Sequence, residues 1–262
     1  MATCLLAALA RPGFTQPPET VFLEELTWTE LRDLVRTGKT TIILPIGGTE
    51  QSGPHVALGK HNVRVKALAG RIAQRLGTAL VGPVMAYVPE GALDPPSGHM
   101  RFPGTISVPD DVFRRVLESA VRSLRLHGFR EVVLLGDHGS TQAGQRAVAT
   151  RLNREWAGTP VRVHAVEEYY RASTAGVHAL LKARGHRDEE LGRHAGLADT
   201  ALMLAVDPRL VRMGRWPGGA GRPDVDGVDG DPSRASAELG QPAIELIVTR
   251  TLDAIRQSIA HR

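Results

Sequence analysis

Short apolar runs alternate along the chain with longer segments whose apolar residues recur every three or four positions. The run at 41–46 (TIILPI) is continuous, as expected for a buried strand. Similar runs at 79–84, 131–135 and 161–166 predict three more strands, and helical patterns fill 63–76, 109–126, 143–155, 172–183, 198–205 and 243–260. A helix over 27–38 precedes the first strand, with Thr27 and Glu30 in capping-box positions. This alternation predicts an α/β fold with a mostly parallel sheet and helices on both faces.

Two segments break this pattern and are rich in proline and glycine. Residues 87–108 are too long for a plain connection, which favours a functional loop, and residues 214–240 are irregular. Neither segment divides the chain, so we expect one domain over 21–262. Within residues 1–20, a short apolar run ends in Ala8-Leu9-Ala10, which fits either a signal-peptide remnant or a flexible N-terminus. The compartment, cytoplasmic or periplasmic, therefore stays open.

Composition narrows the classes of function. Lys and Arg exceed Asp and Glu by 32 to 28, and these charges are scattered, so we expect no nucleic-acid partner. The single cysteine, Cys4, excludes an intramolecular disulfide, a cysteine-based zinc site and a CxxC redox pair. No apolar run approaches the ~20 residues of a membrane span, so we also expect no membrane partner.

Polar side chains follow the first and third predicted strands at the points where these strands end. Glu50 lies in the loop GGTEQSGPHVALGKHN after the first strand, and Asp137 and His138 follow the third. The carboxyl ends of parallel strands meet at one edge of a sheet, which is where ligands bind in such folds. Carboxylates and imidazoles gathered there suit a catalytic divalent metal. The candidate residues are Glu50, His55, His61, His99, Asp137, His138, His194 and Asp199.

Five stretches, in order over roughly residues 40–240, resemble the creatininase (creatinine amidohydrolase) family. They read LPIGGTEQSGPHVALGKH, GHMRFPGTISV, HGFREVVLLGDHG, HAGLADTALMLAVDPRLV and GVDGDPSRASAELG. The resemblance implies a three-layer α/β/α sandwich and assembly as a homohexamer. It also implies hydrolysis of C–N bonds in small cyclic amides or formamides by means of a divalent metal pair.

The sequence departs from the family pattern at positions where the family has metal ligands. Ser52 and Ser140 replace residues that the family uses as ligands, and neutral hydroxyls are poor ligands for zinc or manganese. His61 stands where the family usually has aspartate, and Asp199 where it has glutamate. The resemblance therefore implies one divalent ion per subunit, zinc or manganese. Its expected ligands are Glu50, His61 and His138, with Asp137 or Asp199 completing the set; the alternative is a degenerate site that holds no metal.

His194 matches the family's catalytic histidine and is the expected general acid, and we count Glu50 and His99 as catalytic with it. His194 and Asp199 can converge only if a helix begins at Gly196. Ser52, His55 and Ser140 are expected to line the pocket. For His55 and His99, a structural hydrogen-bonding role fits the sequence as well as a catalytic role does. The predicted function is a metal-dependent hydrolase of a C–N or lactone bond in a small molecule. The alternative is an inactive oligomeric binding or scaffold protein with the same fold.

Overall fold

Four parallel strands form the centre of the computed structural model, which describes residues 19–261. The strand order is β2–β1–β3–β4, with bounds Ala79–Val81 (β2), Thr41–Ile46 (β1), Glu131–Gly136 (β3) and Arg162–Ala165 (β4). β1 and β3 pair along their whole length, so that Ile46 lies opposite Gly136. The carboxyl ends of these two central strands are therefore neighbours. The predicted parallel sheet is confirmed.

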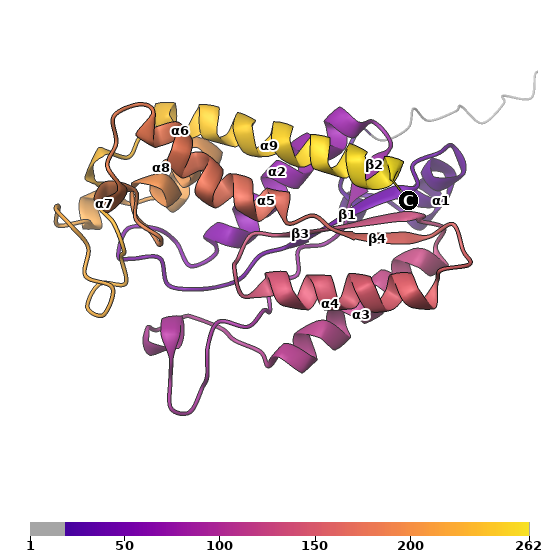
Figure 1. The fold of residues 1–262 in the computed structure, drawn as a ribbon, viewed down its shortest axis with the longest axis horizontal. Coiled ribbons are helices and arrows are strands. Elements are labelled where there is room, and N and C mark those ends of the chain that lie inside the picture. The colour runs from indigo at the N-terminus through magenta and orange to yellow at the C-terminus, as the bar shows by residue number, and fades with distance from the viewer. Residues whose placement is uncertain (1–18, 262) are drawn as a thin grey trace, which may run out of the picture.

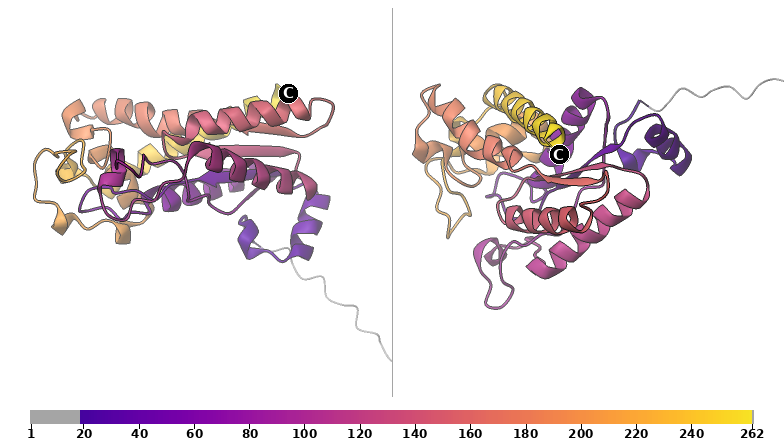
Figure 2. Two further views of the ribbon diagram at one scale, coloured as in Figure 1. Left: turned by 90° about the horizontal axis from the view of Figure 1, so that it is seen from below. Right: turned by 45° about the vertical axis from the view of Figure 1, so that its right-hand side comes forward.

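Helices cover both faces of the sheet, which gives three layers (Figure 1). α2 (Lys60–Leu76), α8 (Leu197–Val206) and α9 (Ala237–Ala260) pack on one face, and α3 (Asp110–Leu126) and α4 (Thr141–Glu155) on the other. Successive strand residues point to opposite faces: Ile43 and Val133 join the α2/α9 core, whereas Ile42 and Val132 join the α3/α4 core. Figure 2 shows α9 running along the face opposite α3 and α4.

The remaining elements are short. α1 (Trp28–Arg36) begins with the predicted capping box, in which the Thr27 side chain accepts from the Glu30 backbone N–H. α5 (Glu168–Arg171) and α6 (Val177–Lys182) are joined by a π-helical turn at Ala172–Gly176, and α7 (Asp188–Leu191) follows. The predictions for residues 1–18 lie outside the described residues. No helix within residues 19–261 is long and apolar enough to cross a membrane.

Three predicted boundaries differ from the structure by three residues or more. The second strand ends at Val81, just before Gly82 and Pro83, and proline cannot donate to a sheet. α9 begins at Ala237, six residues earlier than predicted, because the Ser236 side chain caps it and Pro242 is accommodated inside it. α2 begins at Lys60 rather than at residue 63. This earlier start places Lys60, His61 and Arg64 together on the first two turns of the helix, with Arg64 one turn after Lys60.

Candidate active site

A cavity of 330 Å³ opens at the carboxyl ends of β1 and β3, where ligands bind in parallel sheets. Its lining includes Glu50, Lys60, His61, Arg64, His99, Asp137, His138, Tyr170, Arg193, His194 and Asp199. These side chains make the cavity polar and charged. The predicted site residues that lie outside the lining are Ser52, His55 and Ser140. A second cavity of 720 Å³, beneath α1 and α3, is lined almost wholly by apolar side chains.

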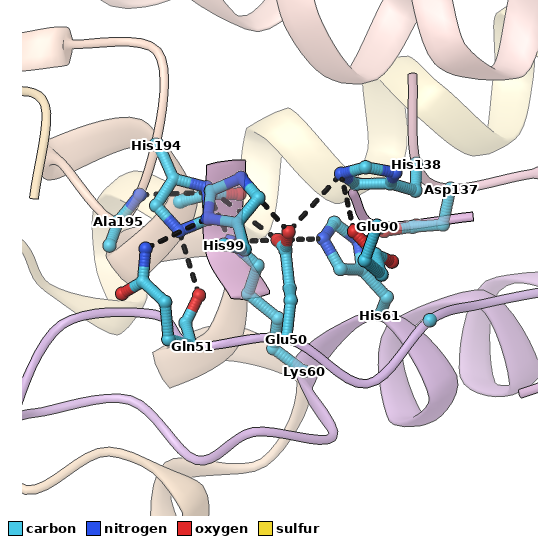
Figure 3. Close-up of polar contacts among 12 residues, drawn as sticks. Glu50, Gln51, Lys60, His61, Glu90, His99, Asp137, His138, His194 and Ala195 are labelled. Atoms are coloured by element: carbon cyan, nitrogen blue, oxygen red, sulfur yellow. Dashed lines mark hydrogen bonds and ion pairs between the residues drawn. The ribbon is translucent and has the colours of Figure 1, made fainter. Parts of the chain in front are cut away.

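Glu50 lies at the centre of the polar cluster and is fully buried (Figure 3). Its Oε1 lies 2.6 Å from His61 Nε2 and 3.4 Å from Lys60 Nζ. Its Oε2 lies 3.2 Å from both His99 Nε2 and His138 Nε2, yet no described residue makes a hydrogen bond to it. Burial alone would raise the pKa of Glu50, but the charges of Lys60 and His61 outweigh burial and hold this pKa well below its usual value. Glu50 is therefore ionised.

His61 lies between two carboxylates, on the first turn of α2. Its Nε2 faces Glu50 and its Nδ1 contacts Asp137 Oδ1. Burial would lower the pKa of His61, but the charge of Glu50 and the contacts with both carboxylates raise it. Asp137 holds a proton on Nδ1, so the proton that Nε2 shares with Glu50 is the one that must leave before this nitrogen can bind a metal.

His138 has its tautomer fixed in the same sense. The Ser140 hydroxyl donates to the Pro89 carbonyl, 2.5 Å away, so its oxygen accepts from His138 Nδ1 at 2.7 Å. The Ser140 N–H also approaches Nδ1, but at 3.4 Å this contact is much longer than the hydroxyl contact, so Nδ1 donates to the hydroxyl and Nε2 of the neutral ring carries the lone pair. The ligand atoms of Glu50, His61 and His138 all lie within 4.8 Å of one another, which is the spacing of a metal-binding group.

Glu50, His99 and His194 form a second group with the same spacing, but its hydrogen bonds differ. Gln51 Nε2 donates to His99 Nδ1 at 2.9 Å, and Gln51 Oε1 is fixed by the Gly53 N–H. The neutral His99 ring therefore carries its proton on Nε2, the atom nearest Glu50, and has no free lone pair there. The second group therefore directs a proton toward Glu50 from His99, whereas His138 in the first group directs a lone pair toward it.

His194 faces the cavity with its basic nitrogen. Its Nε2 donates to the Gln51 carbonyl at 2.8 Å, so the unprotonated Nδ1 lies 3.5 Å from Glu50 Oε1. Burial and the charge of Lys60 lower the pKa of His194 to about 3, so the ring is neutral at physiological pH. The His99 ring lies alongside, with centroids 4.3 Å apart, and burial lowers its pKa as well.

His194 and Asp199 converge on the cavity as the sequence required. Gly196 is the N-cap of α8, and His194 lies before it in an extended segment that bridges to Asp229. Ala195 adopts a left-handed conformation, with φ of 53°, and its N–H donates to Asp199 Oδ2 at 3.0 Å. The turn therefore folds His194 back over the start of the helix.

Asp137 and Asp199 are both engaged by buried cations. Arg64 donates to both oxygens of Asp137 at 2.6–3.1 Å and to Asp199 Oδ1 at 2.7 Å. Lys60 Nζ lies 2.8 Å from Asp199 Oδ2, and the Tyr169 hydroxyl donates to Asp137 Oδ2 at 2.5 Å. In this arrangement the two carboxylates hold His61, Lys60 and Arg64 in place. Their role as additional metal ligands stays a prediction.

Three predicted pocket residues do not reach the cavity. Ser52 is fully buried, and no described residue bonds its hydroxyl. His55 makes a hydrogen bond to Thr200 at 2.9 Å and packs against Trp216, an arrangement that matches the structural alternative for His55. Ser140 makes its hydrogen bond to Nδ1 of His138, the ring nitrogen that faces away from Glu50.

Lys60, Arg64 and Glu90 belong to the cluster but were not predicted from the sequence. Glu90 Oε2 lies 3.3 Å from His138 Nε2. A lysine and an arginine four residues apart on an otherwise apolar helix face were the available signal for the first two. Glu90 lies in the 87–108 loop, which had been singled out as functional but whose residues carried no recognisable motif.

The chain matches known proteins over most of its length. It is 28% identical to creatinine amidohydrolase of Pseudomonas putida over 91% of this chain and 97% of that protein. It is 27% identical to the mycofactocin precursor peptide peptidase of Mycolicibacterium smegmatis over 82% and 84%. A 3-dehydro-scyllo-inosose hydrolase of Thermotoga maritima is 29% identical over 75% of this chain and 59% of that protein. The three names all describe hydrolytic enzymes, and they name different substrates.

Solved creatininase structures share the fold. One superposes with a TM-score of 0.76 and 29% identity, covering 92% of this chain and 99% of that one. Others with similar coverage are described as a manganese form and as a Zn–Zn form of a variant, with TM-scores of 0.72 and 0.74 at 29% identity. The family model described as creatininase (creatinine amidohydrolase) matches residues 24–255. The chain therefore belongs to the creatininase family and is a hydrolase of that family.

Proposed function

We propose that this protein uses one divalent ion, zinc or manganese, to hydrolyse a C–N bond of an amide, cyclic amide or formamide, or a lactone bond, in a small molecule. The observation that carries this proposal is the convergence of Glu50, His61 and His138, with Nδ1 of each ring held by a neighbouring acceptor and Nε2 of each ring directed at Glu50. The cavity of 330 Å³ lies at the lower end of the range for small-molecule sites.

Charge supports a divalent ion at this position. The carboxylates of Glu50, Glu90, Asp137 and Asp199 face two fixed cations, the side chains of Lys60 and Arg64. With Glu90 ionised and the imidazoles neutral, which is the state that metal binding requires, the cluster carries two more negative than positive charges; in the metal-free protein, protons on Glu90 and His61 compensate them. Buried charge is costly unless it is compensated, so a doubly charged cation would balance the site.

A divalent ion held there supplies Lewis acidity toward the substrate carbonyl and lowers the pKa of water toward ~7. His194 presents an unprotonated Nδ1 to the cavity and can accept the proton of the attacking water. The same nitrogen can return that proton to the leaving nitrogen or oxygen. His99, with its proton on Nε2, can donate to an oxygen of the substrate. Lys60 keeps Glu50 ionised.

Elemental analysis of the purified protein tests the metal. We expect about one divalent ion per chain in the wild type and much less in His138→Ala, while His127→Ala, an exposed histidine at the end of α3, serves as the control. A panel of lactams, lactones and formamides then tests activity. A protein that takes up no zinc or manganese after reloading would refute the proposal and favour the scaffold alternative.

We also propose a closed homo-oligomer, a hexamer, which rests on the family relationship alone. Light scattering at micromolar concentration tests the oligomer, and a stable monomer would refute it.

A further inference from the structure

Glu90 is a buried carboxylate that lacks the partners such a group requires. The residue is 5% exposed, and neither oxygen receives a hydrogen bond from any described residue. An isolated buried carboxylate costs several kcal/mol unless a proton, a cation or a set of donors compensates it. The fold therefore holds this group in a place that is unfavourable for a free anion.

Three electron-pair donors face one another at this place. Glu90 Oε2 lies 3.3 Å from His138 Nε2, and the same nitrogen lies 3.2 Å from Glu50 Oε2, which is itself without a hydrogen bond (Figure 3). His138 Nδ1 already donates to Ser140, so the neutral ring has no proton to offer from Nε2. Such lone pairs repel unless a proton or a cation lies among them.

The surrounding backbone holds Glu90 in this position. The Glu90 N–H donates to Ser107 Oγ at 2.9 Å, and Ser107 Oγ donates to the Gly91 carbonyl at 2.8 Å. On the strand side, Gly48 has φ of +152°, and a Cβ there would lie 2.5 Å from Glu90 Oε1. Ser140 bonds the preceding Pro89 carbonyl and His138 at once, so it fixes the loop and the imidazole together.

We propose that Glu90 is a further ligand of the divalent ion, which would be held by Glu50, His61, Glu90 and His138. This inference rests on the proposed function. It ties the metal to the 87–108 loop, so binding of the ion and order of the loop depend on each other. Glu90 is not among the residues lining the cavity, so its role is to hold the ion rather than to contact the substrate.

Glu90→Gln tests the ligand directly, because the amide keeps the size of the side chain but cannot bind as an anion. Asp94→Asn is the matched control, since Asp94 is an exposed carboxylate in the same loop. Zinc affinity is measured by competition with a chelator, and the absorption spectrum of the cobalt(II)-loaded protein reports the ligand set. We expect Glu90→Gln to weaken zinc by at least the ~10–100-fold that loss of an outer partner costs, and to alter the cobalt spectrum. Asp94→Asn should match the wild type in both.

The stability of the metal-free protein separates a ligand from a structural residue. We expect metal-free Glu90→Gln to melt no lower than metal-free wild type, because the change removes an uncompensated acid. A lower melting temperature with unchanged zinc affinity would overturn the proposal. Anomalous diffraction from zinc-loaded wild type needs no variant, and should place a Glu90 oxygen ~2.0–2.2 Å from the ion.

The outcomes distinguish the two proposals. An ion held by Glu50, His61 and His138, with Glu90 more than ~3 Å away, would overturn the role of Glu90 and leave the proposed function intact. A wild-type protein without any metal would overturn both.

Discussion

Arg64 makes hydrogen bonds to the carboxylates of both Asp137 and Asp199 in the candidate site. The loss of folding free energy on removing it can be estimated from these contacts. The side chain is 3% exposed and bonds both oxygens of Asp137 and one of Asp199. Burial would lower the pKa of Arg64, but the charges of Asp137 and Asp199 raise it well above its usual value. Burial would raise the pKa of both carboxyl groups. The charge of Arg64 on Asp137, and the charges of Lys60 and Arg64 on Asp199, hold both pKa values below the usual value of an aspartate.

Arg64→Met should leave a hydrophobic side chain of similar length beside two buried anions that have lost a partner. Removing one member of a buried ion pair costs about 3–5 kcal/mol. In domains of about 150–250 residues, each kcal/mol of lost stability lowers the melting temperature by ~2–4 °C, so we expect a fall of roughly 10 °C. Arg75→Met is the matched control on the same helix, because Arg75 pairs with Glu245 in the same bidentate manner but is 41% exposed. An exposed pair contributes about 1 kcal/mol or less.

Urea unfolding with a chelator present measures the difference without a contribution from metal. The folded-state pKa values of Asp137 and Asp199 lie below the unfolded value of ~3.9, so their stabilisation is fully present above pH ~5 and is lost as the pH falls through the folded values. The gap between wild type and Arg64→Met should therefore be constant from pH ~5 to 8 and shrink in acid. A loss no larger than that of Arg75→Met would refute the reasoning.

Three further predictions concern the site. Ser140→Ala removes the acceptor for His138 Nδ1, so zinc affinity measured by chelator competition should fall by ~10–100-fold, and an unchanged affinity would contradict the assigned tautomer. Zinc binding at pH 6 should release more than one proton, because the pKa of His61 is raised and that of Glu90 lies at about 9; calorimetry in buffers of different ionisation enthalpy counts these protons, and release of less than one would be inconsistent. His194→Ala should lower kcat by ~10²–10⁴-fold with metal content unchanged, whereas unaltered turnover would exclude proton transfer by His194.

Local sequence patterns were enough to predict the fold. Part of the site could not be predicted, because it depends on contacts between residues that are far apart in the sequence. β1 and α3 have the bounds expected from an apolar run and from acidic residues in the first helical turn. The convergence of His194 with Asp199 followed from the glycine before α8. Glu90 could not be found in this way, because its significance comes from His138 and Glu50 on the ends of two other strands.

The same limit applies to the ligand set. Asp137 and Asp199 are acidic residues in the expected places, and the sequence offered no reason to exclude them as ligands. Their side chains are engaged by Lys60 and Arg64, and the Lys60–Asp199 contact spans 139 residues. Whether a carboxylate is a ligand or a supporting partner depends on which cation lies nearest. That information is present only in the folded chain.

The hydrogen bonds around Glu50 divide the cavity into two chemically different sides. On one side, Asp137 and Ser140 hold protons on the Nδ1 atoms of His61 and His138, which leaves their Nε2 atoms as electron-pair donors. On the other side, Gln51 donates to His99 through its side chain and accepts from His194 through its carbonyl, which leaves one ring with a proton and the other with a lone pair facing inward. A buried charged cluster gives little net stability, so stability alone does not explain its presence. The division explains it better: one side can hold a cation, the other can take up and return a proton, and Glu50 lies within 3.5 Å of both.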